Sequence, residues 1–210
     1  MEQTPSRPKR KPRRWRSRIM LVLGYVVAAL LLAWFFQERP TTTVIFVRHA
    51  DVDAGTTDPD PPLNARGRQR AELLADFLQS ADVVGGVNNI YAAADKRTQE
   101  TAAPLAKRLG LTPHIDDPHR IERLIHRILR DRSGDIVLVV SYADTIAPLI
   151  AELHGSKRVP PIADDDYDEL YIVTSPNFGR VKTLRFHYPE PPPEAELPHA
   201  ELSESDGGAR

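Results

Sequence analysis

A buried strand that ends in an arginine–histidine pair is the feature that most constrains this chain. Residues 43–47 form an unbroken run of apolar or β-branched side chains, which is typical of a strand covered on both faces of a sheet. Arg48 and His49 follow directly. In open α/β folds the carboxyl ends of such strands lie at the sheet edge where ligands bind. At that edge an imidazole can act as a nucleophile, and a guanidinium can bind an anion through several donors.

Strand and helix patterns alternate along residues 41–188, which is long enough for one ordinary domain. This alternation predicts an α/β fold: a three-layer α/β/α arrangement with a mostly parallel sheet and helices on both faces. Pro104 falls inside one expected helix, where we expect a kink or a break. The expected strands are near residues 43–47, 89–93, 135–140, 169–174 and 180–187, and the expected helices are near residues 64–78, 96–109, 121–129 and 146–153.

The N-terminal part of the chain predicts a membrane anchor. Residues 1–18 carry eight Lys/Arg against one acid, and residues 19–36 carry no charge. A helix over that uncharged run lies at the lower limit of length for crossing a bilayer. The run closes on three aromatic residues without a small-x-small cleavage site, which favours an uncleaved anchor over a signal peptide. We therefore expect one transmembrane helix over 19–36, with residues 1–18 in the cytoplasm and the domain on the periplasmic side of a cell inner membrane.

The composition of the chain narrows the range of partners and cofactors that it could bind. Outside the basic block, residues 19–210 hold 20 Lys/Arg against 28 Asp/Glu, so this acidic part of the chain is a poor candidate for binding nucleic acid. The chain has no cysteine, which excludes disulfide and thiolate chemistry. No metal-ligand spacing is present, and no cofactor is expected. The Pro- and Glu-rich residues 189–210 predict a disordered tail.

Three separated motifs resemble the histidine phosphatase superfamily, the phosphoglycerate-mutase-like enzymes. The first is Arg48-His49-Ala50 at the end of the first strand, and the second is the loop of residues 60–63 that leads to Gly67. The third is the helix start of residues 97–102, Arg-Thr-Gln-Glu-Thr-Ala. Residues 167–170 are also similar to small bacterial members. The resemblance implies a phosphoglycerate-mutase-like fold over residues 43–187.

The resemblance also implies roles for individual residues. His49 would be the nucleophile that takes the phosphoryl group. Arg48 and Arg97 would bind the phosphoryl oxygens and offset the charge that builds during transfer, without a metal. Arg48, Arg97 and Asp144 are the candidate substrate-binding residues. The general acid stays open among Asp51, Asp58, Asp60 and Asp144.

One position departs from the family pattern. After the strand near 135–140 the family presents a second histidine, whereas this chain has Tyr142. A tyrosine hydroxyl can donate one hydrogen bond but carries no charge at neutral pH. Loss of a charged donor from such a site commonly costs ~10²- to 10³-fold in rate. We therefore count Tyr142 as the fourth candidate catalytic residue and expect Tyr142→His to raise the rate.

Two functions remain open from the sequence. The first is a membrane-anchored phosphatase that acts on a phosphomonoester or a phosphohistidine, in a small molecule or a phosphoprotein. The second is a catalytically silent domain that binds a phosphorylated ligand or a protein partner. His49 with Arg48 and Arg97 favours the enzyme, and Tyr142 favours the silent domain.

Overall fold

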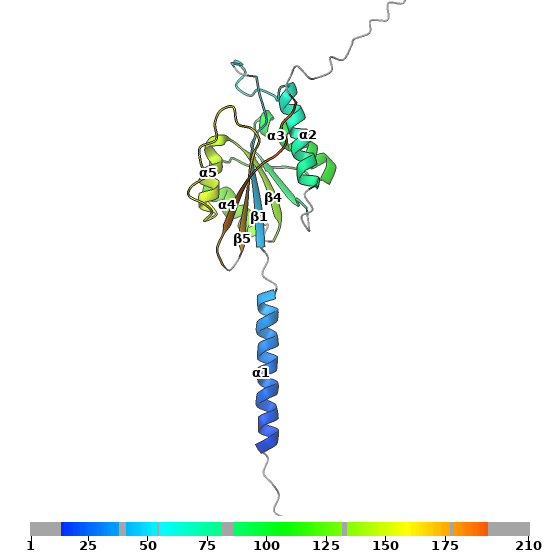
Figure 1. The fold of residues 1–210 in the computed structure, drawn as a ribbon, viewed down its shortest axis with the longest axis vertical. Coiled ribbons are helices and arrows are strands. Elements are labelled where there is room, and N and C mark those ends of the chain that lie inside the picture. Colours follow the sequence, from blue (N-terminus) through cyan, green and yellow to red (C-terminus); the bar gives the residue numbers. More distant parts are fainter. Residues whose placement is uncertain are drawn as a thin grey trace, which may run out of the picture. The chain divides into compact units, whose positions relative to one another are not determined.

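The computed structural model describes residues 14–37, 41–53, 55–80, 86–131, 134–176 and 179–192 (Figure 1). The chain divides into two units, residues 1–39 and 40–210. Most of the predicted basic segment, up to residue 13, and the predicted tail from residue 193 onward lie outside the described residues.

In the first unit, helix α1 (Arg14–Gln37) covers the uncharged run of residues 19–36. Large apolar side chains along it are exposed, among them Leu21, Leu30 and Trp34. None of the helices in the described part of the chain combines the length and the apolarity that a membrane crossing needs. Membrane insertion of residues 19–36 stays a prediction.

The second unit contains a six-stranded mixed sheet with the order β3-β2-β4-β1-β5-β6. β1 to β4 run parallel, and β5 and β6 are antiparallel to their neighbours. The α/β fold class is confirmed, and β3 is a two-residue strand that the sequence pattern did not predict. The strands are β1 (Thr41–Arg48), β2 (Asn89–Ala92), β3 (His114–Ile115), β4 (Ile136–Ser141), β5 (Glu169–Pro176) and β6 (Lys182–His187).

Helices cover both faces of this sheet (Figure 1). α2 (Ala65–Ser80) and α3 (Lys96–Leu109) pack on one face, and α4 (Ile121–Asp131) and α5 (Ala143–Glu152) pack on the other. The apolar side chains of β1 alternate between these two layers: Ile45 and Val47 face α2 and α3, while Val44 and Phe46 face α4 and α5. β1 is therefore covered on both faces, as its continuous apolar run predicts.

Capping residues determine where the helices begin and end. The Asn64 side chain accepts a 2.8 Å hydrogen bond from the Gly67 backbone N–H, which confirms Asn64 as the cap of α2. Gly110 ends α3 in the left-handed conformation, with φ of 66°. Of the kink or break expected at Pro104, the break is wrong, because α3 continues through this residue. Buried residues on either side of Pro104, such as Ala102 and Leu105, pack into the core and offset the lost backbone hydrogen bond.

Candidate active site

The carboxyl ends of three adjacent parallel strands open into one cleft of about 860 Å³. β2, β4 and β1 lie side by side, with Ala92 opposite Val140 and Arg48 opposite Ser141. The segments that follow these strands therefore meet at one edge. All five candidate catalytic and substrate-binding residues line the cleft: Arg48, His49, Arg97, Tyr142 and Asp144. The structure thus brings the sequence-predicted set together.

The imidazole of His49 is held in one tautomer. Its Nδ1 lies 2.8 Å from the carbonyl oxygen of Ala50. A carbonyl can only accept, so Nδ1 carries the proton and Nε2 keeps its lone pair. The backbone around the ring is fixed as well, because the His49 N–H bonds to Ser141 O at 3.0 Å and the Ala50 N–H bonds to Thr101 Oγ1 at 2.9 Å.

Burial also keeps this imidazole neutral. His49 is 6% exposed. Burial lowers its pKa to about 4, and the nearby Arg97 and Arg48 act in the same direction, against the hydrogen bond to Ala50. At neutral pH the ring therefore presents an unprotonated nitrogen, which is the form that can attack phosphorus.

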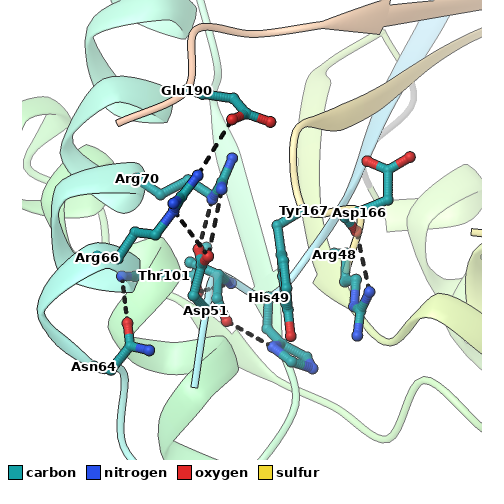
Figure 2. A network of polar contacts seen from close by, with 12 residues as sticks. Arg48, His49, Asp51, Asn64, Arg66, Arg70, Thr101, Asp166, Tyr167 and Glu190 are labelled. Atoms are coloured by element: carbon teal, nitrogen blue, oxygen red, sulfur yellow. Dashed lines mark hydrogen bonds and ion pairs between the residues drawn. The ribbon is translucent and has the colours of Figure 1, made fainter. Parts of the chain in front are cut away.

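Arg48 is held by uncharged groups. Its Nη1 donates to the carbonyl oxygens of Ala163, at 2.7 Å, and Asp166, at 3.0 Å. Its guanidinium lies 4.2 Å from the centre of the Tyr167 ring, as Figure 2 shows from the side. Its Nε is buried without a hydrogen-bond partner among the described residues. The cation is therefore positioned by carbonyls and a ring, and its charge remains available to an anion.

Arg97 lies in the first turn of α3, two residues after Asp95, the N-cap residue of this helix. Its Nη2 is 2.8 Å from Asp95 Oδ2, and its guanidinium lies 5.1 Å from the centre of the Tyr142 ring. The first turn of a helix favours anions because its backbone N–H groups are free. One of these groups is already used, because Asp60 Oδ1 accepts the Lys96 N–H at 2.8 Å. Arg97 is thus a cleft cation whose charge Asp95 partly offsets.

Tyr142 stands between these groups. Its ring meets the His49 ring edge-on, with centroids 6.2 Å apart. Burial raises the pKa of Tyr142 to about 12, and a hydrogen bond with Asp95 acts in the same direction. The hydroxyl therefore keeps its proton at neutral pH.

The four carboxylates considered as general acids lie in different environments. Asp51 is buried and forms an ion pair with Arg70, with Arg70 Nε 2.5 Å from Asp51 Oδ2, and Arg66 lies 3.5 Å away (Figure 2). Asp58 and Asp60 do not line the cleft. Asp144 does line it, in the first turn of α5.

The Asp51 ion pair depends on a close approach between backbones. A Cβ added to Gly67 would lie 2.1 Å from the Asp51 carbonyl oxygen. Only glycine therefore lets the first turn of α2 come this near to the segment that follows His49. That explains the glycine in the loop motif singled out from the sequence.

Several cleft residues were missed at the sequence level. Asp95 could have been found from its position directly before a helix, where aspartate is a common cap. His119 had no such signal, because it follows the two-residue strand β3 that no pattern predicted. The remaining polar residues of the cleft that the sequence did not single out are Asp116, Asp117 and Asp164.

The sequence showed no metal-ligand spacing, yet three ligand-type side chains meet in space. Asp166, Asp168 and His187 place donor atoms within 4.8 Å of one another. His187 Nδ1 is already 3.1 Å from Asp168 Oδ2, and the His187 side chain is exposed. These residues lie outside the cleft lining.

Comparison with known proteins identifies the fold. Residues 44–118 match the Histidine phosphatase superfamily (branch 1), a stretch that contains Arg48, His49 and Arg97 but not Tyr142. The structure resembles the protein histidine phosphatase SixA complexed with tungstate, with a TM-score of 0.56 and 18% identity over 69% of this chain and 96% of that one. It also resembles a mycobacterial glucosyl-3-phosphoglycerate phosphatase, with a TM-score of 0.55 and 14% identity over 70% of this chain and 98% of that one.

A curated relative matches a shorter stretch. The PE-PGRS family protein PE_PGRS11 of Mycobacterium tuberculosis is 37% identical over 76 residues, which is 33% of this chain and 12% of that protein. The chain therefore spans only about an eighth of the length of this relative. The chain is thus similar to the histidine phosphatase superfamily over residues 44–118, and its domain shares the fold of these two phosphatases.

Proposed function

We propose that this domain is a phosphatase that hydrolyses a phosphomonoester or a phosphohistidine through a phosphohistidine intermediate at His49. The observation that carries the proposal is the tautomer of His49. Its Nδ1–H is used by the Ala50 carbonyl, so Nε2 is the nitrogen with a lone pair in a cleft that also holds two arginines. A neutral, oriented imidazole beside fixed cations suits nucleophilic attack on phosphorus.

Each arginine has a distinct part in this mechanism. Arg48, held by the carbonyls of Ala163 and Asp166, needs no rearrangement to bind a phosphoryl oxygen. Arg97 reaches the same cleft from the first turn of α3. Together they offset the charge on the oxygens during transfer, at positions that are set before the substrate binds.

The test is the hydrolysis of a generic aryl phosphate by the full chain. The wild type should turn over slowly, and His49→Ala should abolish turnover because the nucleophile is gone. His126→Ala, at an exposed position of α4 outside the cleft lining, is the matched control and should behave as wild type. A wild-type rate that survives His49→Ala would refute the phosphohistidine mechanism.

The second candidate is a catalytically silent domain that binds a phosphorylated ligand or a protein partner. It is favoured by Tyr142, which offers no charge where the family pattern has a second histidine, and by Asp95, which pairs with Arg97. In that case the wild type shows no turnover above background. His49→Ala would then alter only the affinity for inorganic phosphate, measured by calorimetry.

We also propose that residues 19–36 anchor the protein in a cell inner membrane, with residues 1–18 in the cytoplasm and the domain in the periplasm. The uncharged run, the basic block before it and the exposed apolar side chains of α1 support this. A reporter fused after Arg210 should be active only outside the cytoplasm. Cytoplasmic reporter activity, or a soluble form cut near Gln37, would contradict it.

A further inference from the structure

His119 shares the cleft with the proposed nucleophile although no motif marks it. Its ring stacks on the Tyr142 ring, with centroids 5.3 Å apart and planes 19° from parallel. Both rings line the cleft together with His49. The backbone before α4 fixes its place, because the His119 N–H donates to Asp117 Oδ1 at 3.0 Å. A second imidazole thus enters the cleft from a different loop than the family pattern would suggest.

The ring of Tyr142 contacts both imidazoles of the cleft. The same ring meets His49 edge-on at 6.2 Å and His119 face-on at 5.3 Å. Its hydroxyl keeps its proton at neutral pH, because burial raises its pKa to about 12. Tyr142 therefore neither carries charge nor releases a proton there, but its ring orients the imidazole of His119 within the cleft.

The other titratable groups of the cleft suit proton donation less well. Asp95 pairs with Arg97, and Asp116 lies 2.7 Å from Arg127. Asp117 lies 3.5 Å from Arg120. Asp144 and Asp164 also line the cleft, as exposed carboxyl groups. An imidazole, in contrast, is the type of side chain that generally exchanges protons near neutral pH.

We infer that His119 is the proton donor to the leaving group in the proposed phosphatase reaction. The inference rests on the proposed function. The lone pair of His49 Nε2 forms a bond to phosphorus while the bond from phosphorus to the leaving oxygen breaks with its electron pair. The His119 imidazolium gives its proton to that oxygen, so the product leaves as a neutral alcohol.

The second half of the reaction restores both residues. Neutral His119 takes a proton from the attacking water as the water oxygen bonds to phosphorus. The phosphorus–nitrogen bond then breaks, and its electron pair returns to His49 Nε2. Inorganic phosphate leaves, and His119 is again protonated for the next turnover.

The test compares two leaving groups. An alkyl phosphate releases a basic oxygen that needs a proton, whereas p-nitrophenyl phosphate releases one that does not. In the full chain, His119→Gln should lower kcat/KM for the alkyl ester ~10²- to 10³-fold and lower the alkyl-to-aryl ratio by at least ~10-fold. The alkaline decline of the alkyl-ester pH profile should disappear in the same variant. His126→Gln, exposed on α4 and outside the cleft lining, should leave both rates and both profiles unchanged.

Three other results would overturn the inference. Equal losses for both esters in His119→Gln would mean that His119 only shapes the cleft. Unchanged rates for both esters, or wild-type turnover confined to the aryl ester, would mean that no proton comes from His119. Absence of turnover in the wild type, by contrast, would refute the proposed function and the inference with it.

Discussion

The two walls of the cleft are built in different ways. What we term the buried wall consists of Arg48 and His49, which line the cleft, and of Asp51 and Arg70, which lie outside its lining. Each is less than a tenth exposed, and they are fixed by carbonyls or by a buried ion pair. The open wall consists of Arg97, His119, Tyr142 and Asp144, which are partly or fully exposed. The Tyr142 ring contacts His119 and Arg97, and Arg97 forms an ion pair with Asp95.

This difference separates two tasks. The buried wall sets the tautomer and position of the proposed nucleophile, so its residues contribute to folding and to chemistry together. The open wall adds Arg97 to the phosphoryl site and faces the leaving group through its other residues, and its side chains can change with little effect on the core. Substitutions in the buried wall should therefore alter stability, and those in the open wall should alter rate alone.

The largest effect is expected at Arg70, which is 2% exposed and pairs with Asp51. Arg70→Met removes one partner of a buried pair and leaves a carboxylate uncompensated, which should lower the free energy of unfolding by about 3–5 kcal/mol. Arg66→Met is the matched control, because Arg66 also approaches Asp51 but has a 40% exposed side chain. Its cost should stay within ~1 kcal/mol. Equal denaturant midpoints for the two variants would contradict the claim that the buried Asp51–Arg70 pair stabilises the fold.

The next effect is a pH dependence from His49. Its pKa is about 4 in the folded protein against an ordinary value of 6.5. Between these values the unfolded chain binds a proton that the folded protein does not, so stability is lost as pH falls from 6.5 towards 4. The loss should reach about 3 kcal/mol. His49→Asn should lack this component of the unfolding profile, and identical profiles for the variant and the wild type would show that His49 is not buried in its neutral form.

In the open wall, Arg97→Gln should act on rate. Removal of one cation from the phosphoryl site should lower kcat for aryl phosphate ~10²-fold. The side chain is 26% exposed and pairs only with Asp95 among the described residues, so the free energy of unfolding should change by less than ~1 kcal/mol. A drop in melting temperature as large as that of Arg70→Met would remove the distinction between the walls.

The smallest effects are expected at Tyr142. Tyr142→Phe keeps the ring that stacks on His119 and loses only the hydroxyl, so kcat should fall no more than about threefold. Tyr142→His adds an imidazole next to Arg97 and should raise kcat for the alkyl ester up to ~10-fold. The gain should be larger in the His119→Gln background, where the added imidazole replaces the lost donor. A fall in that background would show that Tyr142 has a role of its own.

The buried wall was largely predictable from sequence, and the open wall was not. A continuous apolar run that ends in Arg48 and His49 predicts β1. The N-cap Asn64 and the glycine Gly67 predict the start of α2. These signals are local, because burial on both faces and backbone geometry restrict which residues fit. The partners that fix the nucleophile, such as the Ala50 carbonyl, need only the backbone.

The open wall depends on contacts between distant segments. His119 stacks on Tyr142, 23 positions away, and neither the stack nor the strand β3 before it leaves a periodic pattern. One part of the buried wall shares this property, because Arg48 is held by the carbonyls of Ala163 and Asp166, more than a hundred positions downstream, and carbonyls have no sequence signature. Pro104 shows the opposite case, since a strong local signal for a break was overridden by packing on both sides of it.

The central claim is that His49 Nε2 takes the phosphoryl group, and trapping the intermediate tests it most directly. The full chain would be mixed with labelled aryl phosphate, quenched in base, which preserves phosphohistidine, and mapped by mass spectrometry. The account predicts label on His49 in the wild type, more label in His119→Gln because neutral His119 no longer activates water, and none in His49→Ala. Label on another residue, or label that persists in His49→Ala, would contradict it.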